Sequence, residues 1–286
     1  LPEGGDWTPA GDAAATLRAL ATLPQPPRWV LDDHYGLGAE WHRAVATGGA
    51  RIAVLDDLAD RPLDGEVLID QNAVTERHHR YPDLTPGRCT HLLGPRYTLL
   101  RRDVRLAAQA RAAVPPQALA HGPTLLFMGG ADADGLTLKL LPWLSGAALP
   151  GPLHVLAGAM NRHQAALETR CREGGHGFDV ARRDLLPLLA SARAAVVACG
   201  MFAVELQALG VPCLLLPLSD IQRQVAEGFV AHGRAVLRSP EQLSDAAATA
   251  RAIDELLTLP FHASDTLAVA PDGASRVVKH LIESTP

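Results

Sequence analysis

The sequence is poor in several residue types, and each shortage excludes a class of protein. Its 286 residues include only four cysteines, which are scattered and form no C-x-x-C pair. This spacing excludes a disulfide framework and a cysteine-based zinc site, so we expect reduced thiols that lie mostly in the core. No apolar run approaches the roughly 18 to 20 residues of a membrane span, and the first residues lack the pattern of a signal peptide. We therefore expect a cytoplasmic protein without a membrane partner.

Basic charge is also scarce. The formal net charge is -5 and the pI is about 6.2, and only Lys139 and Lys279 among the 26 basic residues are lysines. Without a basic stripe, binding to a nucleic-acid backbone is not expected, although a small anion can still bind a local site. The motifs G-x-x-x-x-G-K-[ST] and G-x-G-x-x-G are both absent, which argues against P-loop kinases and against NAD binding.

Short apolar strands alternate with helical stretches along the whole chain, which is typical of an α/β fold with parallel sheets. In the first half, strands are expected at 28–31, 51–55, 66–69 and 91–93, with a helix at 102–113. In the second half, strands are expected at 124–130, 153–158, 194–200, 212–218 and 234–237. The helices expected there lie at 135–144, 161–173, 183–192, 201–209, 220–232 and 240–258. Between the halves, "AVPPQALAHGP" at 113–123 has the composition of a linker. We therefore expect two domains, at 1–115 and 122–286.

The second half has the elements of a complete doubly wound domain, whereas the first half does not. It opens on a helix at 11–23 and has no leading strand. Doubly wound domains begin with a strand and a tight loop. We therefore expect either that the first domain is small or that it is truncated by at least one βαβ unit of about 30 residues.

Polar side chains follow each expected strand of the first half. They are Asp33, His34 and Tyr35 after 28–31, Asp57 after 51–55, Asn72 after 66–69, and "GPRYTLLR", which contains Tyr97 and Leu100, after 91–93. Ligands of open α/β sheets lie outside the carboxyl ends of the strands, so these residues are candidates to line one cleft. Each of them could instead cap a helix or shape a turn.

Two runs in the second half have the pattern of a nucleotide site. Gly129 and Gly130 follow a strand and precede a helix, where backbone N–H groups and the helix dipole favour a pyrophosphate; a plain tight turn is the alternative. Glu205 lies one turn into a helix among apolar neighbours. It can accept hydrogen bonds from both hydroxyls of a ribose, unless it is a solvated helix acid. Gln222, near the start of the next helix, can reach a sugar hydroxyl.

Seven segments occur in a recognisable order: "DDHYG", "LDD", Asn72, "GPRYTLLR", "MGGAD", "ELQALGVPCLLLPLSDIQ" and "PDGASRVV". Together they resemble the UDP-2,4-diacetamido-2,4,6-trideoxy-β-L-altropyranose hydrolase family of pseudaminic acid biosynthesis. The resemblance implies the GT-B fold, in which two Rossmann-like doubly wound domains face a cleft, with the sugar held by the first domain and UDP by the second. It also implies that water replaces UDP at the anomeric carbon with inversion, and that no metal or other cofactor is required.

The resemblance also implies a role for each candidate residue. His34, Tyr35 and Asn72 would position the sugar and the attacking water. The remaining substrate contacts would come from Asp33, Asp57, Tyr97, Leu100, Gly129, Gly130, Glu205 and Gln222. The family's general base is a His in a G-x-G-H-x-x-R loop that has no counterpart in this sequence. We therefore expect this chain to hydrolyse its UDP-sugar slowly or not at all.

Two other functions fit the same residues. One is an inverting UDP-sugar glycosyltransferase of GT-B fold, and the other is a non-catalytic nucleotide-sugar binding protein. The acidic strand ends argue against the apolar, basic surface that an acceptor lipid or sugar needs. In all three cases the expected partner is a UDP-sugar, and we expect a monomer.

Overall fold

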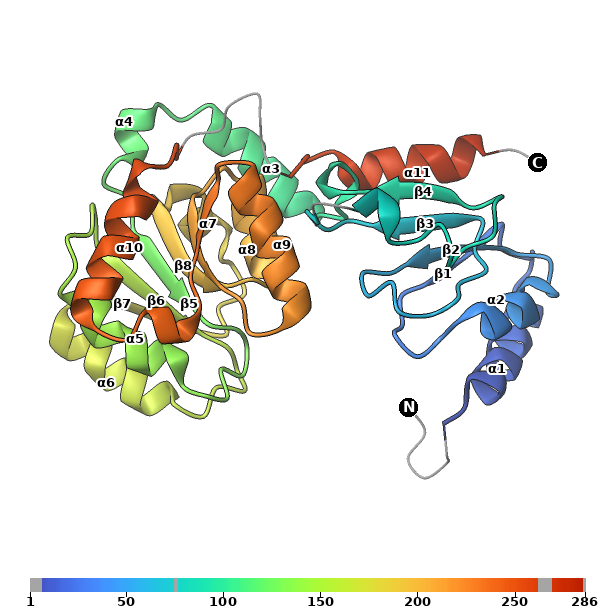
Figure 1. The fold of residues 1–286 in the computed structure, drawn as a ribbon, viewed down its shortest axis with the longest axis horizontal. Coiled ribbons are helices and arrows are strands. Elements are labelled where there is room, and N and C mark those ends of the chain that lie inside the picture. The colour runs from blue at the N-terminus through green and yellow to red at the C-terminus, as the bar shows by residue number, and fades with distance from the viewer. Residues whose placement is uncertain (1–6, 75–76, 262–268, 285–286) are drawn as a thin grey trace. The chain divides into compact units, whose positions relative to one another are not determined.

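The structure is a computed structural model that describes residues 7–74, 77–261 and 269–284 (Figure 1). The chain divides into two compact units. The first contains the described residues up to Asn72, those from 77 to 97, and those from Val277 onward. The second contains Ala73, Val74 and the described residues between Thr98 and Arg276. No helix among the described residues is long and apolar enough to cross a membrane.

The first unit is built on a four-stranded parallel sheet in the order β1-β2-β3-β4. Its strands are β1 (Trp29–Asp32), β2 (Arg51–Leu55), β3 (Val67–Asp70) and β4 (Thr90–Leu93), and its short 3-10 helices are η1 (Arg77–His79) and η2 (Pro95–Tyr97). Asp32 pairs with Val54, and Asp70 pairs with Leu93. The strands therefore end nearly level, and the side chains that follow them gather at one edge.

One face of this sheet is covered by α1 (Pro9–Ala21) and α2 (Ala39–Ala46). The first of these helices begins where Thr8 accepts a hydrogen bond from the Gly11 N–H at 3.1 Å and Pro9 presets the backbone angle. The helix α11 (Gly273–Glu283) ends in the same unit, where the Trp29 Nε1–H donates to the Leu281 carbonyl at 3.0 Å. Arg28 donates to the carbonyls of Ile282 and Ser284, so the end of α11 is tied to the start of β1.

The second unit has a six-stranded parallel sheet in the order β10-β9-β8-β5-β6-β7. Its strands are β5 (Thr124–Phe127), β6 (Leu153–Ala157), β7 (Gly177–Val180), β8 (Ala194–Ala198), β9 (Cys213–Leu216) and β10 (Ala235–Leu237). Its helices are α3 (Arg102–Ala112), α4 (Pro116–Leu119), α5 (Leu136–Ser145), α6 (Gln164–Gly174), α7 (Leu186–Ser191), α8 (Met201–Ala208), α9 (Asp220–Ala231), η3 (Pro240–Gln242) and α10 (Ala246–Thr258). The strand order reverses between β8 and β5, so this unit is doubly wound as the sequence predicts.

Helices cover both faces of the second sheet (Figure 1). One core packs α3, α7, α8 and α9 against the sheet, and the other packs α5, α6 and α10 against the opposite face. The central strands β8 and β9 are buried along their whole length, as expected for strands covered on both sides.

The division between the units differs from the boundary that the prolines at 113–123 predict. Val104 and Ala108 of α3 are buried in the core of the second unit, together with Ala73 and Val74 from far earlier in the chain. The prolines therefore mark the loop around α4 inside that unit. As expected, all four cysteines are free thiols, and Cys171, Cys199 and Cys213 are buried.

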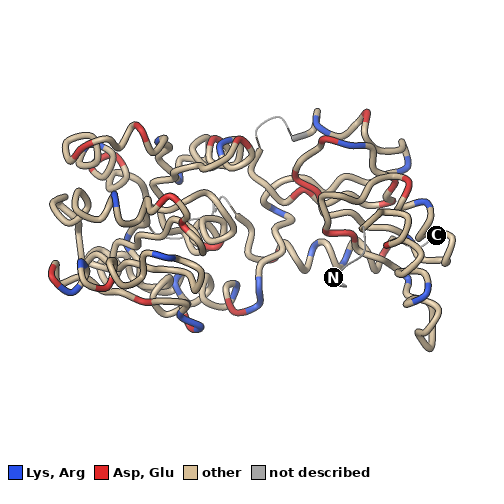
Figure 2. Tube along the Cα trace, turned by 90° about the horizontal axis from the view of Figure 1, so that it is seen from below, with Lys and Arg blue, Asp and Glu red and all other residues tan. Residues whose placement is uncertain are grey.

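Charged positions of both signs are spread over each unit (Figure 2). Over the described residues, the Lys and Arg positions do not gather into one continuous stretch.

Candidate functional site

Three of the predicted residues meet at the carboxyl edge of the first sheet. The Asn72 side-chain amide, just after β3, donates to Asp57 Oδ2 at 3.2 Å, just after β2. Tyr35, which follows β1, lies beside the same carboxylate. The negative charge of Asp57, followed by partial burial and a hydrogen bond to Asp57, raises the pKa of the Tyr35 hydroxyl above its ordinary value. Tyr35 therefore stays protonated and acts as a hydrogen-bond donor at neutral pH.

Asp57 is the acceptor that links these residues, which we name the first-unit cluster: Tyr35, Asp57 and Asn72. Its Oδ1 atom is buried and has no hydrogen-bond partner among the described residues. A buried carboxylate oxygen without a partner is costly unless it has a use or binds water. This oxygen is therefore a buried acceptor of the cluster for which the described residues supply no donor.

A buried hydrogen-bond network around Asp70 holds the backbone of Asp57 and Asn72 in place. Asp70 is fully buried and accepts from Arg80 at 2.6 Å and from the Tyr81 hydroxyl at 3.1 Å. Arg80 also donates to the Asp57 carbonyl at 2.6 Å. The sequence patterns did not single out Arg80 or Tyr81, because neither residue follows directly on a strand. The adjacent Arg and Tyr were the available signal, since both side chains can donate hydrogen bonds to a buried aspartate.

Burial raises the pKa of Asp70 to about 6, because desolvation outweighs the stabilising hydrogen bonds from the Asn72 N–H, Arg80 and Tyr81. The folded state thus holds its proton more tightly than the unfolded chain, in which the value is 3.8. The stability that this proton provides is fully present below pH 3.8 and is lost as the pH rises through about 6.

We compare the unfolding free energy of the native chain with that of Asp70→Asn at each pH. The native value minus the variant value should fall by about 3 kcal/mol between pH 3.5 and pH 7. Asparagine has no proton to lose, so the variant lacks this contribution to the pH dependence. Urea unfolding of both proteins at several pH values measures the difference. Parallel curves across this range would show that Asp70 has an ordinary pKa.

The other predicted residues of the first unit lie differently. His34 is exposed, and its Nδ1 accepts the Gly36 N–H at 3.0 Å, so the proton of the neutral ring is on Nε2. Asp33 is exposed, and its charge contributes to the raised pKa of Tyr35. Tyr97 is half-buried, with the Arg96 guanidinium 5.1 Å from its ring.

Two strand-end residues have packing roles instead of ligand roles. Leu100 is 9% exposed and belongs to the hydrophobic core of the second unit, so its side chain is not part of the polar set at the strand ends. Asp32 is buried and bonds to His42 at 2.8 Å, where it orients α2. The period of a strand sends alternate side chains to opposite faces, which explains why not every residue in "LDDHY" faces the edge.

In the second unit the predicted nucleotide residues gather where the strand order reverses. β5 and β8 pair directly, so Gly129 and Gly130 after β5 lie next to Gly200 and α8 after β8. Phe127 and Phe202 are in edge contact at 4.9 Å, which joins the end of β5 to the first turn of α8. Ligands of doubly wound sheets bind at this switch point. We name the region formed by Gly129, Gly130, Gly200 and Glu205 the switch-point site.

The two helices at the switch point differ in how their first turns are bonded. At α5, Asp132 accepts from the Leu136 N–H at 2.8 Å and from the Thr137 N–H at 3.0 Å. The Asp132 carboxylate thus bonds the end of the helix that was expected to direct its dipole at a pyrophosphate, and the contact of Gly129 and Gly130 with a pyrophosphate stays a prediction. At α8, the capping residue is Gly200, and no side chain in the described part of the chain caps the first turn. The helix end open to an anion is thus that of α8.

Glu205 is held in place and is not a solvated helix acid. Its side chain is 13% exposed, and Arg101 lies 3.2 Å from Oε1. Burial raises the pKa of Glu205, and the charge of Arg101 opposes this rise. Sequence reasoning missed Arg101 as a partner, although it is the last residue of "GPRYTLLR". A half-buried carboxylate held by one arginine retains acceptor capacity for other donors.

Gln222 is fixed against the loop that follows β9. Its Oε1 accepts the Leu218 N–H at 2.9 Å, and its own N–H donates to Ser219 at 3.4 Å. The first turn of α9 is therefore ordered by its own side chains.

The turn formed by Gly129 and Gly130 depends on a further glycine, Gly158, in the loop that packs against it. Gly129 has φ +99°, which favours glycine, and nothing lies within 4 Å of an added Cβ at Gly129 or Gly130. A Cβ at Gly158, in contrast, would lie 2.2 Å from the Gly130 carbonyl oxygen. Gly158 thus allows the close approach of two loops that shapes the turn.

We expect Gly158→Ala to displace the Gly130 backbone, to lower the unfolding free energy by about 1 to 3 kcal/mol and to weaken UDP binding. Gly146→Ala is the matched control, because its added Cβ would meet nothing closer than 3.8 Å. Thermal unfolding and UDP titration of both variants measure the two effects. Equal behaviour of the two variants would mean that the turn tolerates the shift.

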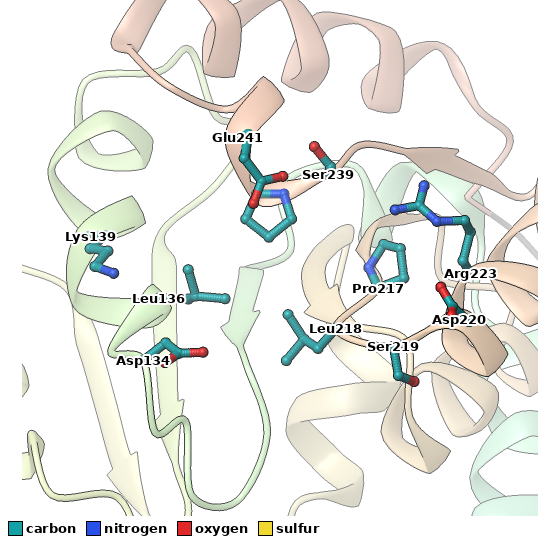
Figure 3. A pocket seen from close by; sticks show the side chains of 11 residues that line it. Asp134, Leu136, Lys139, Pro217, Leu218, Ser219, Asp220, Arg223, Ser239 and Glu241 are labelled. Atoms are coloured by element: carbon teal, nitrogen blue, oxygen red, sulfur yellow. The ribbon is translucent and has the colours of Figure 1, made fainter.

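A cavity of about 460 Å³ opens in the second unit (Figure 3). Its walls come from the start of α5, from the loop after β9 with the first turn of α9, and from η3. It is lined by Asp134, Leu136, Lys139, Pro217, Leu218, Ser219, Asp220, Arg223, Ser239, Pro240 and Glu241. None of the residues predicted from the sequence is among them. In the described part of the chain, no group of three or more His, Cys, Asp or Glu side chains is arranged to hold a metal ion.

Comparison with known proteins identifies the fold. No protein-family model and no curated protein matches this chain. Among solved structures, MurG of Acinetobacter baumannii is similar with a TM-score of 0.62 and 15% identity, over 96% of this chain and 78% of that one. The UDP-GlcNAc 2-epimerase of Methanocaldococcus jannaschii has a TM-score of 0.58 and 12% identity, over 97% and 84%. UGT89C1 of Arabidopsis thaliana, solved with UDP, has a TM-score of 0.58 and 13% identity, over 94% and 77%. The chain has the GT-B fold, with a parallel α/β sheet in each unit.

Proposed function

We propose that this chain is a UDP-sugar enzyme that breaks the bond between the anomeric carbon and UDP. The observation that supports this most is the switch-point site, where Glu205 is 13% exposed on α8 and the first turn of the same helix has no side-chain cap. A fixed carboxylate can accept both hydroxyls of a ribose, and the open helix end favours a phosphate. UGT89C1, a structure of similar fold, was solved with UDP, which is consistent with this assignment.

Transfer of the sugar to an acceptor hydroxyl is the reaction that the structural neighbours favour, because glycosyltransferases are prominent among them. In this reaction the acceptor oxygen forms a bond to the anomeric carbon and the bond to the UDP oxygen breaks. The acceptor proton passes to a base, and UDP leaves with the bonding electrons. The enzyme must therefore supply a proton acceptor for the nucleophile and a positive environment for UDP.

Asp57 is the best candidate for that base. Its Oδ1 lacks a protein partner in the described residues, whereas Oδ2 is positioned by Asn72. The other carboxylates at this edge are less suitable: Asp56 pairs with Arg61 at 2.8 Å and Asp70 pairs with Arg80. We propose that the first-unit cluster orients the nucleophile while the second unit holds UDP.

Hydrolysis of a UDP-diacetamido-trideoxyhexose, with inversion, is the second candidate. In that case water takes the place of the acceptor hydroxyl, and the same base serves. The acidic first-unit cluster favours it, because carboxylate, amide and phenol groups suit a small polar nucleophile better than a lipid acceptor. The sequence resemblance to the pseudaminic acid pathway hydrolases supports this reading.

Incubating the full chain with UDP-GlcNAc and with the diacetamido UDP-sugar, in EDTA, tests both candidates. A hydrolase releases UDP and free sugar without an acceptor, and in H₂¹⁸O the label enters the sugar. A transferase releases UDP only when an acceptor, such as a glycolipid or an oligosaccharide, is added. Formation of an epimer without UDP release, or no reaction under any of these conditions, would contradict the proposal.

A further inference from the structure

Tyr35 reaches Asp57 from a different loop, so the two residues stay together only if the two loops do. The Tyr35 side chain lies between β1 and α2 and is 64% exposed, and its hydroxyl donates a hydrogen bond to Asp57, just after β2. An exposed side chain has little packing to fix it. The place of the Tyr35 hydroxyl therefore depends on how the backbone of its loop is fastened to the end of β2.

Arg61 holds the loop that carries Tyr35. The Nε–H of Arg61 donates to the Leu37 carbonyl at 2.6 Å, and its Nη2–H donates to the His34 carbonyl at 3.2 Å. These two carbonyls lie on either side of Tyr35 along the chain. A planar guanidinium presents several donors in a fixed geometry, so one side chain can hold both acceptors at once.

The third nitrogen of the same guanidinium is tied to the end of β2. Arg61 Nη1 lies 2.8 Å from Asp56 Oδ1 and 2.9 Å from Asp60 Oδ1. The Asp56 side chain is fully buried and also accepts the Ala59 N–H at 2.8 Å, so it is a rigid anchor. Asp56 directly precedes Asp57 in the chain. Arg61 is thus fixed one residue away from the acceptor that the tyrosine must reach.

The burial of this contact separates it from an ordinary surface ion pair. The Arg61 side chain is only 17% exposed, whereas Arg43, which pairs with Asp64 in the same unit, is 65% exposed. Exposed pairs contribute little because solvent screens them. A lysine in place of Arg61 would keep the positive charge but would lose the planar fork that reaches both carbonyls and the carboxylate.

We propose that Arg61 is a positioning residue that fixes the Tyr35 hydroxyl against Asp57 for the reaction at the first-unit cluster. Arg61 acts through the loop that carries Tyr35, without a contact of its own to the sugar. Its effect on the reaction rate rests on the function proposed above, whereas its effect on the place of Tyr35 can be measured without a substrate.

The titration of Tyr35 reports its distance from Asp57. The charge of Asp57, followed by burial and the hydrogen bond to Asp57, raises the pKa of Tyr35 above 10.0. Asp33 and Asp56 add smaller increases, and the positive charge of Arg61 acts in the opposite direction. The informative exchange is therefore Arg61→Lys, which keeps that charge and removes the fork.

The chain has only three tyrosines, so ¹³Cζ-tyrosine labelling of the full chain makes this titration readable by NMR. The variant Tyr35→Phe identifies the Tyr35 signal. In Arg61→Lys the midpoint of this signal should move down toward 10.0, because the hydroxyl leaves Asp57. Arg43→Lys is the matched control and should keep the native midpoint. A native midpoint in Arg61→Lys as well would overturn the proposal.

Amide hydrogen exchange at neutral pH gives the same information if Arg61→Lys unfolds in alkali. The N–H groups of Gly36 and Leu37 bond within the loop, to His34 Nδ1 at 3.0 Å and to the His34 carbonyl at 3.3 Å. Both should exchange faster in Arg61→Lys than in the native chain or in Arg43→Lys, since the loop is no longer fastened. Equal exchange in all three proteins would show that Arg61 does not hold the loop.

Single-turnover release of UDP from the UDP-sugar measures the effect on the reaction. Arg61→Lys should lower this rate by about 10- to 100-fold, because a displacement of about 1 Å at the site can cost that much, and should leave the affinity for UDP unchanged. A lowered Tyr35 midpoint with a native rate would overturn the role in the reaction. If the native chain releases no UDP, the proposed function fails, and the midpoint alone decides whether Arg61 places Tyr35.

Discussion

Replacing Asp57 with asparagine should lower the rate of UDP release from a UDP-sugar by about 10²- to 10⁴-fold, the usual contribution of a positioned general base. Asparagine keeps the size of the side chain and one oxygen for the Asn72 amide at 3.2 Å, but it cannot take up the proton of the nucleophile. The affinity for UDP should stay the same, since we propose that UDP binds at the switch-point site and not at Asp57.

Asp33→Asn is the matched control for this change. Asp33 belongs to the same strand-end set but is exposed, so its loss should reduce the rate much less. Single-turnover release of UDP separates the chemical step from binding. If Asp57→Asn retains full activity while Asp33→Asn loses it, the base is Asp33 and the assignment to Asp57 is wrong.

Glu205→Ala should weaken UDP binding by about 1 to 3 kcal/mol, or roughly 5- to 150-fold. The alanine removes the charged acceptor for the ribose hydroxyls and one of the two carboxylates that pair with Arg101, whose other partner is Asp103. Calorimetric titration of UDP into the native and variant chains measures the loss.

Glu227→Ala is the control for Glu205→Ala, because Glu227 is an exposed acid on α9. Its removal should leave the affinity for UDP as it is. Equal affinities of native chain, Glu205→Ala and Glu227→Ala would assign Glu205 to the stability of α8 alone.

The strand pattern of the fold could be predicted from local sequence because buried strands carry continuous apolar runs. "RIAVL" predicts β2 at its observed bounds. The apolar run at 194–200 predicts β8 for the same reason, although the strand ends earlier, at Ala198. β7 was missed because it has only four residues, "GFDV", and follows the glycine-rich stretch 174–177, which has the composition of a turn. The return of α11 to the first unit was missed as well, since no local pattern encodes which distant strand a helix will meet.

The candidate site could be predicted only as far as strand ends are visible in the sequence. Tyr35, Asp57 and Asn72 follow three neighbouring strands, so the parallel sheet brings them together. Arg101 and Glu205 are 104 positions apart, and only the tertiary fold makes them a pair. The hydrogen bonds from the first turn of α5 to the Asp132 carboxylate could not be anticipated either, because an Asp with φ +41° in the loop before the helix gives no periodic signal.

Titration of UDP into the full chain by calorimetry, in EDTA, is the measurement that tests the central claim most directly. The assignment of the switch-point site to UDP predicts saturable binding of one UDP per chain, with the loss described above in Glu205→Ala. Absence of saturable binding up to a dissociation constant on the order of 1 mM, or binding that Glu205→Ala leaves unchanged, would contradict the claim that this GT-B chain holds UDP at the switch-point site.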